Sequence, residues 1–105
     1  MLLSDVMKGI QYKGDVADCE VTDLTSDSRK VTDGVVFVCI KGIKSDGHDF
    51  AEKAVSSGAA AVICDRDLGL ANQMIVGSTR EAFAAMCENF MGYPLDRLKL
   101  IGVTG

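Results

Sequence analysis

The sequence lacks tryptophan and has one proline and one histidine among its 105 residues. Only 6% of the residues are aromatic, but 48% are apolar. This apolar content excludes a disordered or low-complexity chain, because such chains lack the apolar surface that offsets the loss of chain entropy on folding. The length is that of one ordinary domain, so we expect residues 1–105 to form one domain with one hydrophobic core.

The spacing of the cysteines excludes a disulfide framework and a zinc site. No two cysteines form a CxxC pair, and no histidine lies at a spacing that would complete a metal site. Three of the four lie inside apolar runs, which is typical of buried free thiols in a reducing compartment. We therefore expect four free thiols, at Cys19, Cys39, Cys64 and Cys87.

A basic surface and a targeting segment are also absent. The 15 acidic residues outnumber the 11 Lys and Arg residues, and the net charge of −4 argues against nucleic acid or anionic lipid as partners. The N-terminus has no basic region followed by a long apolar one, and no apolar run approaches the roughly 18 residues that span a bilayer. We expect a soluble, cytoplasmic protein with no membrane partner.

Apolar runs alternate with helical patterns along the chain. Continuous runs over 35–40 and 59–64 indicate strands that are buried on both faces, and 74–76 and 98–103 are also strand-like. Apolar residues at helical spacing predict helices over 3–10, 49–58 and from 78 onward. This order predicts an α/β domain with a mainly parallel central sheet flanked by helices.

Two helix starts carry a specific signal. Asp49 precedes Glu52 by three residues, and Ser78 precedes Glu81 by three, so each pair has the spacing of a capping box. The second helix then carries an apolar stripe of Phe83, Met86, Cys87 and Phe90, which we interpret as core.

The first candidate site is the polar run Thr25–Lys30, which follows a predicted strand. Open α/β sheets bind ligands at strand ends, because backbone groups and loop side chains converge there. In the alternative interpretation, Asp27 and Ser28 only bond to nearby amides in an ordinary turn.

The second candidate site is the loop Lys41–Phe50 between a strand and a helix. Gly42 and Gly47 can take positive φ, so the amides of the loop could face a phosphate or a uracil-type carbonyl. Four cations and one acid between residues 29 and 44 give a local charge of +3 in a chain of −4. This asymmetry favours an anionic ligand, although a solvated basic edge explains it as well. His48 on its own is more often structural than catalytic.

No catalytic constellation is recognisable in the sequence. It has no G-x-G-x-x-G loop, no G-x-S-x-G elbow and no H-E-x-x-H motif, and Cys64 and Cys87 have the surroundings of core residues. The final Gly-Val-Thr-Gly is how many phosphate-binding loops begin, but the Gly-Lys-Ser/Thr that completes such a loop is absent. We therefore assign no catalytic and no metal-binding residue.

Several modest motifs occur in a specific order. They are Asp27-Ser28-Arg29, Gly34–Val38, Lys41-Gly42, Asp46–Phe50, Ala54 with Gly58-Ala59, and Leu100–Gly105. From about Thr22 to Gly105 the chain thereby resembles the N-terminal domain of the Mur ligases, specifically the MurE type, the UDP-N-acetylmuramoyl-dipeptide ligases. In that family Thr104 and Gly105 would begin the ATP loop of a central domain. The resemblance therefore implies a domain cut at about 100–105, with the central and C-terminal domains following in cis.

The resemblance also implies an activity for the full-length parent. MurE-type enzymes build peptidoglycan, and hence the bacterial cell wall, in the cytosol. With Mg²⁺, ATP phosphorylates a carboxylate of UDP-MurNAc-L-Ala-D-Glu, and the amine of meso-diaminopimelate or L-lysine attacks the acyl phosphate. The N-terminal domain holds the UDP end of this substrate. Residues 1–105 alone would hold no cofactor and would be inactive.

Site residues follow from the resemblance motif by motif. Ser26 and Ser28 match positions that contact the uridine part, and Ile43, Lys44 and Ser45 match the loop that closes on the nucleotide. The residues that would shape these loops are Asp27, Arg29, Asp46, Gly47 and His48. The sequence departs from the family at Gly34–Phe37, where Gly-Asp-Leu-Phe is more usual, and this change affects a strand start rather than the nucleotide site.

Two other interpretations remain open at this point. MurF-type ligases share Asp-Ser-Arg and Asp-Gly-His-Asp-Phe, but the ending Ile-Gly-Val-Thr-Gly favours the MurE type. A small stand-alone α/β binding module, without catalytic partners, is the alternative from a different class.

Overall fold

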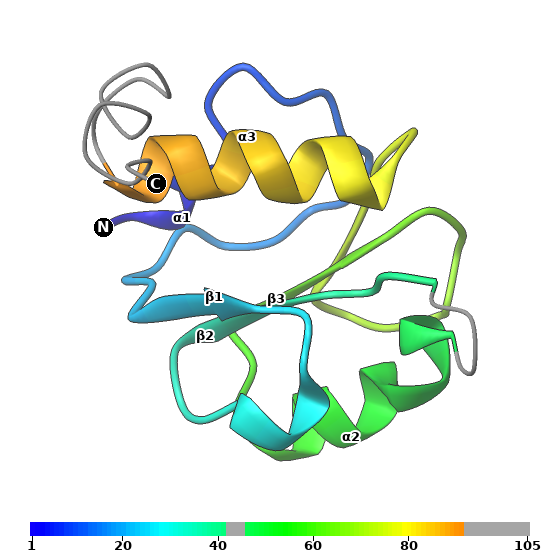
Figure 1. Cartoon of the computed structure of the whole chain (residues 1–105). Helices are drawn as coiled ribbons and strands as arrows, with labels where there is room; N and C mark the ends of the chain where they lie inside the picture. The colour runs from blue at the N-terminus through cyan, green and yellow to red at the C-terminus, as the bar shows by residue number, and fades with distance from the viewer. Residues whose placement is uncertain (42–45, 92–105) are drawn as a thin grey trace, which may run out of the picture.

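The computed structural model describes residues 1–41 and 46–91. Helices and strands alternate through most of this part of the chain (Figure 1). In chain order they are α1 (Leu3–Val6), β1 (Asp23–Thr25), the 3-10 helix η1 (Ser28–Lys30), β2 (Val35–Val38), the 3-10 helix η2 (Gly47–Phe50), α2 (Ala51–Ser56), β3 (Ala61–Cys64), β4 (Gln73–Ile75) and α3 (Thr79–Met91).

The strands form one parallel sheet in the order β1-β2-β3-β4. Leu24 pairs with Val36, Phe37 with Val62, and Ile63 with Met74. Each strand is therefore beside the next one in the chain, and all carboxyl ends meet at one edge of the sheet. The predicted α/β class with a parallel sheet is confirmed.

Helices cover both faces of this sheet (Figure 1). On one face, Val36 and Val38 of β2 pack in a core with residues of α1 and α3, including the fully buried Met86. On the other face, Val35 and Phe37 pack with Ala51 and Ala54 of α2. Side chains alternate between the two faces along a strand, and here the side chains on each face of β2 are buried under helices. The strand is therefore covered on both faces, as the sequence predicts.

Local boundaries differ from the sequence prediction in several places. The capping box at Asp49 is wrong: the chain first forms η2, capped by Asp46, and α2 then begins at Ala51 without a side-chain cap. At α3 the Ser78 Oγ does accept a hydrogen bond from the Glu81 amide, at 3.3 Å. The first helix, β2 and β3 are shorter than predicted, and β4 lies one residue earlier than the predicted 74–76. The predicted strand 98–103 lies outside the described residues.

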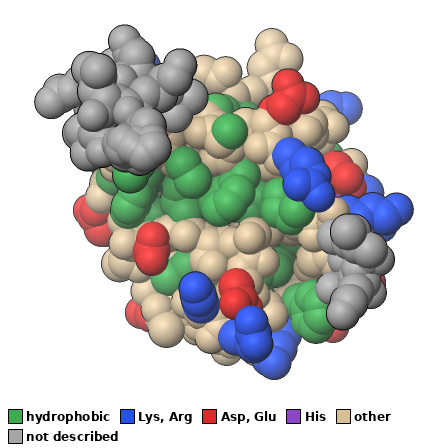
Figure 2. All heavy atoms as spheres, in the orientation of Figure 1, with side chains coloured by type: hydrophobic (Ala, Val, Ile, Leu, Met, Phe, Trp, Pro, Cys, Tyr) green, Lys and Arg blue, Asp and Glu red, His purple; other side chains and the backbone are tan. Residues whose placement is uncertain are grey.

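An apolar groove remains open between β1 and α3. Leu24, Cys87, Phe90 and Met91 line it together with Asp23, and Figure 2 shows a band of hydrophobic side chains across this face of the molecule. In the stripe predicted for α3, Met86 is buried, whereas Phe83, Cys87 and Phe90 are half-buried. No helix among residues 1–41 and 46–91 is long and apolar enough to cross a membrane.

Candidate functional site

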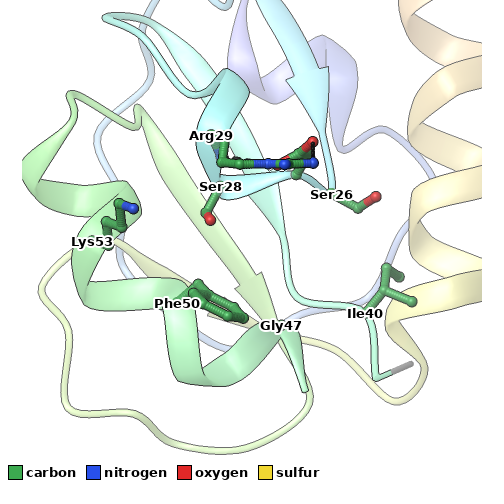
Figure 3. A pocket seen from close by; sticks show the side chains of 8 residues that line it. Ser26, Ser28, Arg29, Ile40, Gly47, Phe50 and Lys53 are labelled. Atoms are coloured by element: carbon green, nitrogen blue, oxygen red, sulfur yellow. Dashed lines mark hydrogen bonds and ion pairs between the residues drawn. The ribbon is translucent and has the colours of Figure 1, made fainter. Parts of the chain in front are cut away.

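An open pocket lies at the carboxyl ends of β1 and β2. Its volume is about 420 Å³. Two walls face each other across it (Figure 3): one comes from the turn after β1, and the other from the residues after β2 and the start of α2. The lining residues are Ser26, Asp27, Ser28, Arg29, Ile40, Gly47, Phe50 and Lys53. The first candidate segment, 25–30, and the described end of the second, 46–50, thus both contribute to this pocket.

Hydrogen bonds between neighbouring residues determine the turn after β1. The Asp27 amide donates to Thr25 Oγ1 at 3.0 Å, and Asp27 Oδ1 accepts from the Arg29 amide at 3.0 Å, which caps η1. The Arg29 guanidinium also binds both carboxylate oxygens of Asp27, at 3.1 and 3.0 Å. These bonds from Arg29, first those of its side chain, lower the pKa of Asp27 to about 2. The Asp27–Arg29 pair is therefore charged at neutral pH and has no net charge.

The hydroxyl groups of the two serines in this turn are available to a ligand. Within the described part of the chain, neither the Ser26 nor the Ser28 hydroxyl makes a hydrogen bond, and both residues line the pocket. Asp27 bonds to the nearby Arg29 amide, as the alternative interpretation expects, but among the described residues the Ser28 hydroxyl makes no such bond. Both serines line the pocket (Figure 3). A contact of Ser26 or Ser28 with a ligand stays a prediction.

Gly47 brings the second wall close to β2. Its amide donates to the Ile40 carbonyl at 3.0 Å, and a Cβ at Gly47 would lie 2.7 Å from the Ile40 nitrogen. Only glycine fits here, because any side chain would collide with backbone that cannot move away. The reason is this close approach and not a positive φ, which Gly47 does not have.

A buried histidine ties this wall to the next strand. The His48 side chain is 2% exposed, and its Nδ1 lies 2.6 Å from Asp46 Oδ1. The backbone amide of Asp65, directly after β3, donates to His48 Nε2 at 3.1 Å. His48 Nε2 also lies 3.0 Å from Asp65 Oδ1, so the buried ring joins the segments that follow β2 and β3. His48 is therefore a structural residue in this arrangement, as its isolation in the sequence suggested.

Arg66 completes this network from the loop after β3. Its Nη2 donates to Asp46 Oδ2 at 3.0 Å, and its Nε donates to Asp65 Oδ1 at 3.0 Å. Hydrogen bonds from the His48 amide and ring, together with Arg66, hold the pKa of Asp46 well below its ordinary value. The predicted loop-shaping residues Asp46, Gly47 and His48 thus hold the pocket wall in place.

Sequence reasoning missed four residues of this region. Ile40 and Lys53 line the pocket, after β2 and from α2, and Asp65 and Arg66 support its wall from the loop after β3. The sequence does contain a signal for Asp65 and Arg66. In a parallel sheet the residues that follow adjacent strands meet at one edge, so the charged residues after 59–64 belong beside those after 35–40.

Two contacts hold Lys41, at the start of the loop 41–46. Lys41 forms an antiparallel bridge with Asp46, and the Lys41 carbonyl accepts a hydrogen bond from Arg80 Nη2 at 2.8 Å. The predicted nucleotide contacts Ile43, Lys44 and Ser45, together with Gly42, lie outside the described residues. Their part in binding stays a prediction.

Residues 1–41 and 46–91 hold no cluster of metal ligands, and the Cys39 thiol is buried. No group of three or more His, Cys, Asp or Glu side chains in this part of the chain could hold a metal ion. Burial raises the pKa of the Cys39 thiol to about 12, so that thiol stays protonated at neutral pH. Thr104 and Gly105, the predicted start of an ATP loop, lie outside the described residues.

Comparison with known proteins identifies the family of this chain. The model of the Mur ligase family, catalytic domain, matches residues 20–93. The chain belongs to the Mur ligase family. The UDP-N-acetylmuramoyl-L-alanyl-D-glutamate--2,6-diaminopimelate ligase of Clostridium perfringens is 39% identical, with 100% of this chain and 23% of that protein aligned. The ligase of the same name from Geobacillus kaustophilus is 46% identical over 82% of this chain and 18% of that protein. The chain thus spans about a fifth of the length of these relatives.

Solved structures of Mur ligases share the fold. The MurF ligase of Thermotoga maritima in complex with ADP superimposes with a TM-score of 0.62 and 32% identity, over 69% of this chain and 17% of that one. A MurF crystal structure from Acinetobacter baumannii has a TM-score of 0.68 over 82% of this chain and 20% of that one. At 22% identity, this second likeness concerns the fold alone. The Mur ligase relationship stated from the sequence motifs is confirmed.

Proposed function

We propose that this Mur ligase chain is the N-terminal domain of a MurE-type enzyme and binds the UDP end of its substrate. The parent enzyme would join 2,6-diaminopimelate or L-lysine to UDP-MurNAc-L-Ala-D-Glu in the cytosol, using ATP and Mg²⁺ held by the central and C-terminal domains in cis. The substrate of the parent follows from the names of the curated relatives, which are 2,6-diaminopimelate ligases.

One observation carries the binding role. The turn Ser26–Arg29, which contains the two serines that the resemblance assigns to the uridine part, and Gly47, which it assigns to shaping the nucleotide loop, line the same pocket. This pocket lies at the carboxyl edge of a parallel sheet, where open α/β sheets bind ligands. Two serine hydroxyls and the aromatic ring of Phe50 are the kinds of groups that hold a nucleoside (Figure 3).

Binding can be tested by titrating UDP-MurNAc into isotope-labelled protein and following the backbone amide NMR shifts. We expect weak binding, with shifts at Ser26–Arg29 and around Gly47, because the remaining substrate contacts belong to the other domains. Ser28→Ala should weaken binding by about 0.5–1.5 kcal/mol, the value of one neutral hydrogen bond. Shifts at other sites, or none at millimolar ligand, would leave Ser26–Arg29 as an ordinary turn.

A MurF-type parent is the second candidate, because a MurF structure at 32% identity shares the fold. The MurE type has more support, since its relatives reach 39% identity over the whole chain and 46% over 82% of it. A chimera decides between them: these residues replace the matching segment of the Clostridium perfringens ligase or of the Thermotoga maritima MurF ligase. We expect higher activity in the diaminopimelate ligase chimera, and the reverse order would favour MurF.

A further inference from the structure

Two cations, Arg29 and Lys53, are among the described residues that line the pocket, but they differ in what they contact. Arg29 is paired through two hydrogen bonds with Asp27, and the pair has no net charge. Lys53 forms no ion pair with any carboxylate in the part of the chain that the structure describes. The net positive charge of the described pocket lining therefore comes from Lys53.

The fold determines where this charge lies. Lys53 is the third residue of α2, and its helix is fixed on the sheet by the buried Ala51 and Ala54 on either side of it in the sequence. Lys53 itself is exposed and lines the pocket, and its helix contacts η1. In Figure 3, Lys53 lies on the same side of the pocket as Ser28, with Ser26 and Ile40 on the opposite side.

The pocket thus has two unlike ends. Phe50 lies between them and is 39% exposed, so its ring offers an apolar surface to a ligand. One end carries the ammonium group of Lys53, and the other carries the apolar side chain of Ile40. A ligand with a flat ring at one end and a phosphate at the other matches this polarity.

We propose that Lys53 is a specificity-determining residue that makes the pocket prefer phosphorylated uridine over uridine. This inference rests on the proposed function, since it assumes that a uridine nucleotide occupies the pocket. The ammonium group would bind a phosphate oxygen, while Arg29 stays with Asp27 and holds the turn. An exposed ion pair of this kind changes an equilibrium constant by up to about fivefold.

The test compares the dissociation constants of uridine, UMP and UDP for the wild-type chain and three variants. Lys53→Met removes the charge and keeps the length, Lys53→Arg keeps the charge, and Lys30→Met is the matched control. Lys30 is an exposed lysine of η1 that does not line the pocket. Thermal unfolding of each variant verifies that it is folded.

We expect Lys53→Met to weaken UDP binding about fivefold and to leave uridine binding within twofold. Lys53→Arg should restore the preference for UDP, and Lys30→Met should retain it. The advantage of UDP over uridine should also shrink between 50 and 200 mM salt in the wild type and less in Lys53→Met, because salt screens charge interactions. Equal weakening of uridine and UDP, or the same loss in Lys30→Met, would overturn the role of Lys53. A wild-type chain that binds none of the three would overturn the proposed function itself.

Discussion

Replacement of His48 should destabilise the whole domain, because its buried ring joins the loops after β2 and β3. His48→Ala removes a hydrogen bond to the Asp46 carboxylate and leaves the Asp65 amide without its acceptor. A hydrogen bond to a charged group contributes about 1.5–3 kcal/mol and a neutral one about 0.5–1.5 kcal/mol. Partial exposure of Asp46 and entry of water reduce this sum, so we expect a loss of about 2–3 kcal/mol.

Urea unfolding at pH 7, followed by circular dichroism, measures this loss. For a domain of this size, 1 kcal/mol shifts the melting temperature by about 4–8 °C, so the expected shift is about 10–20 °C.

Two further variants separate the contact of His48 with Asp46 from its contact with the Asp65 amide. His48→Asn places an amide near the position of Nδ1 and can keep the bond to Asp46, whereas His48→Gln reaches the position of Nε2 and can accept from the Asp65 amide.

Each of these two variants should therefore lose about half as much stability as His48→Ala. A loss below about 0.5 kcal/mol in His48→Ala would refute the argument, since the two loops would then be held without the histidine. Equal losses in all three variants would show that the volume of the ring, and not its hydrogen bonds, is what matters.

Three other predictions concern single groups. Gly47→Ala should lower stability and weaken UDP binding together, because its Cβ would lie 2.7 Å from the Ile40 nitrogen. Gly77→Ala is the control for the loss of a glycine, because Gly77 has no positive φ and an added Cβ there meets nothing within 4 Å. Stability should fall as the pH drops from about 4 toward 2. The folded state lowers the pKa of Asp27 from 3.8 to about 2, so the Asp27 carboxylate stabilises the folded state only while it is ionised. A urea midpoint that stays constant over this pH range would contradict the pair with Arg29. Titration with a thiol reagent after unfolding without reductant should find four free thiols, and two or fewer would contradict the structure, in which all four cysteines are unpaired.

The sequence by itself determined the fold class and the family. Continuous apolar runs and helical stripes are local patterns, and the covered faces of a parallel sheet require them, so they could be read without coordinates. The same holds for Asp27, whose cap of η1 involves only residues two positions away. Element boundaries were less certain, and the Asp49 box failed because Asp46 and Gly47 start a 3-10 helix earlier.

Only the tertiary structure decided which residues share the pocket. Ser28 and Lys53 are 25 positions apart, and no periodicity connects them; they meet because β1 and β2 are adjacent and α2 packs beside η1. The place of Lys53 in the pocket lining, without an ion pair to any carboxylate of the described residues, likewise depends on side-chain positions in space, which the sequence does not contain. The support of His48 by Asp65 arises in the same way, since parallel pairing of β2 with β3 brings together loops 17 residues apart.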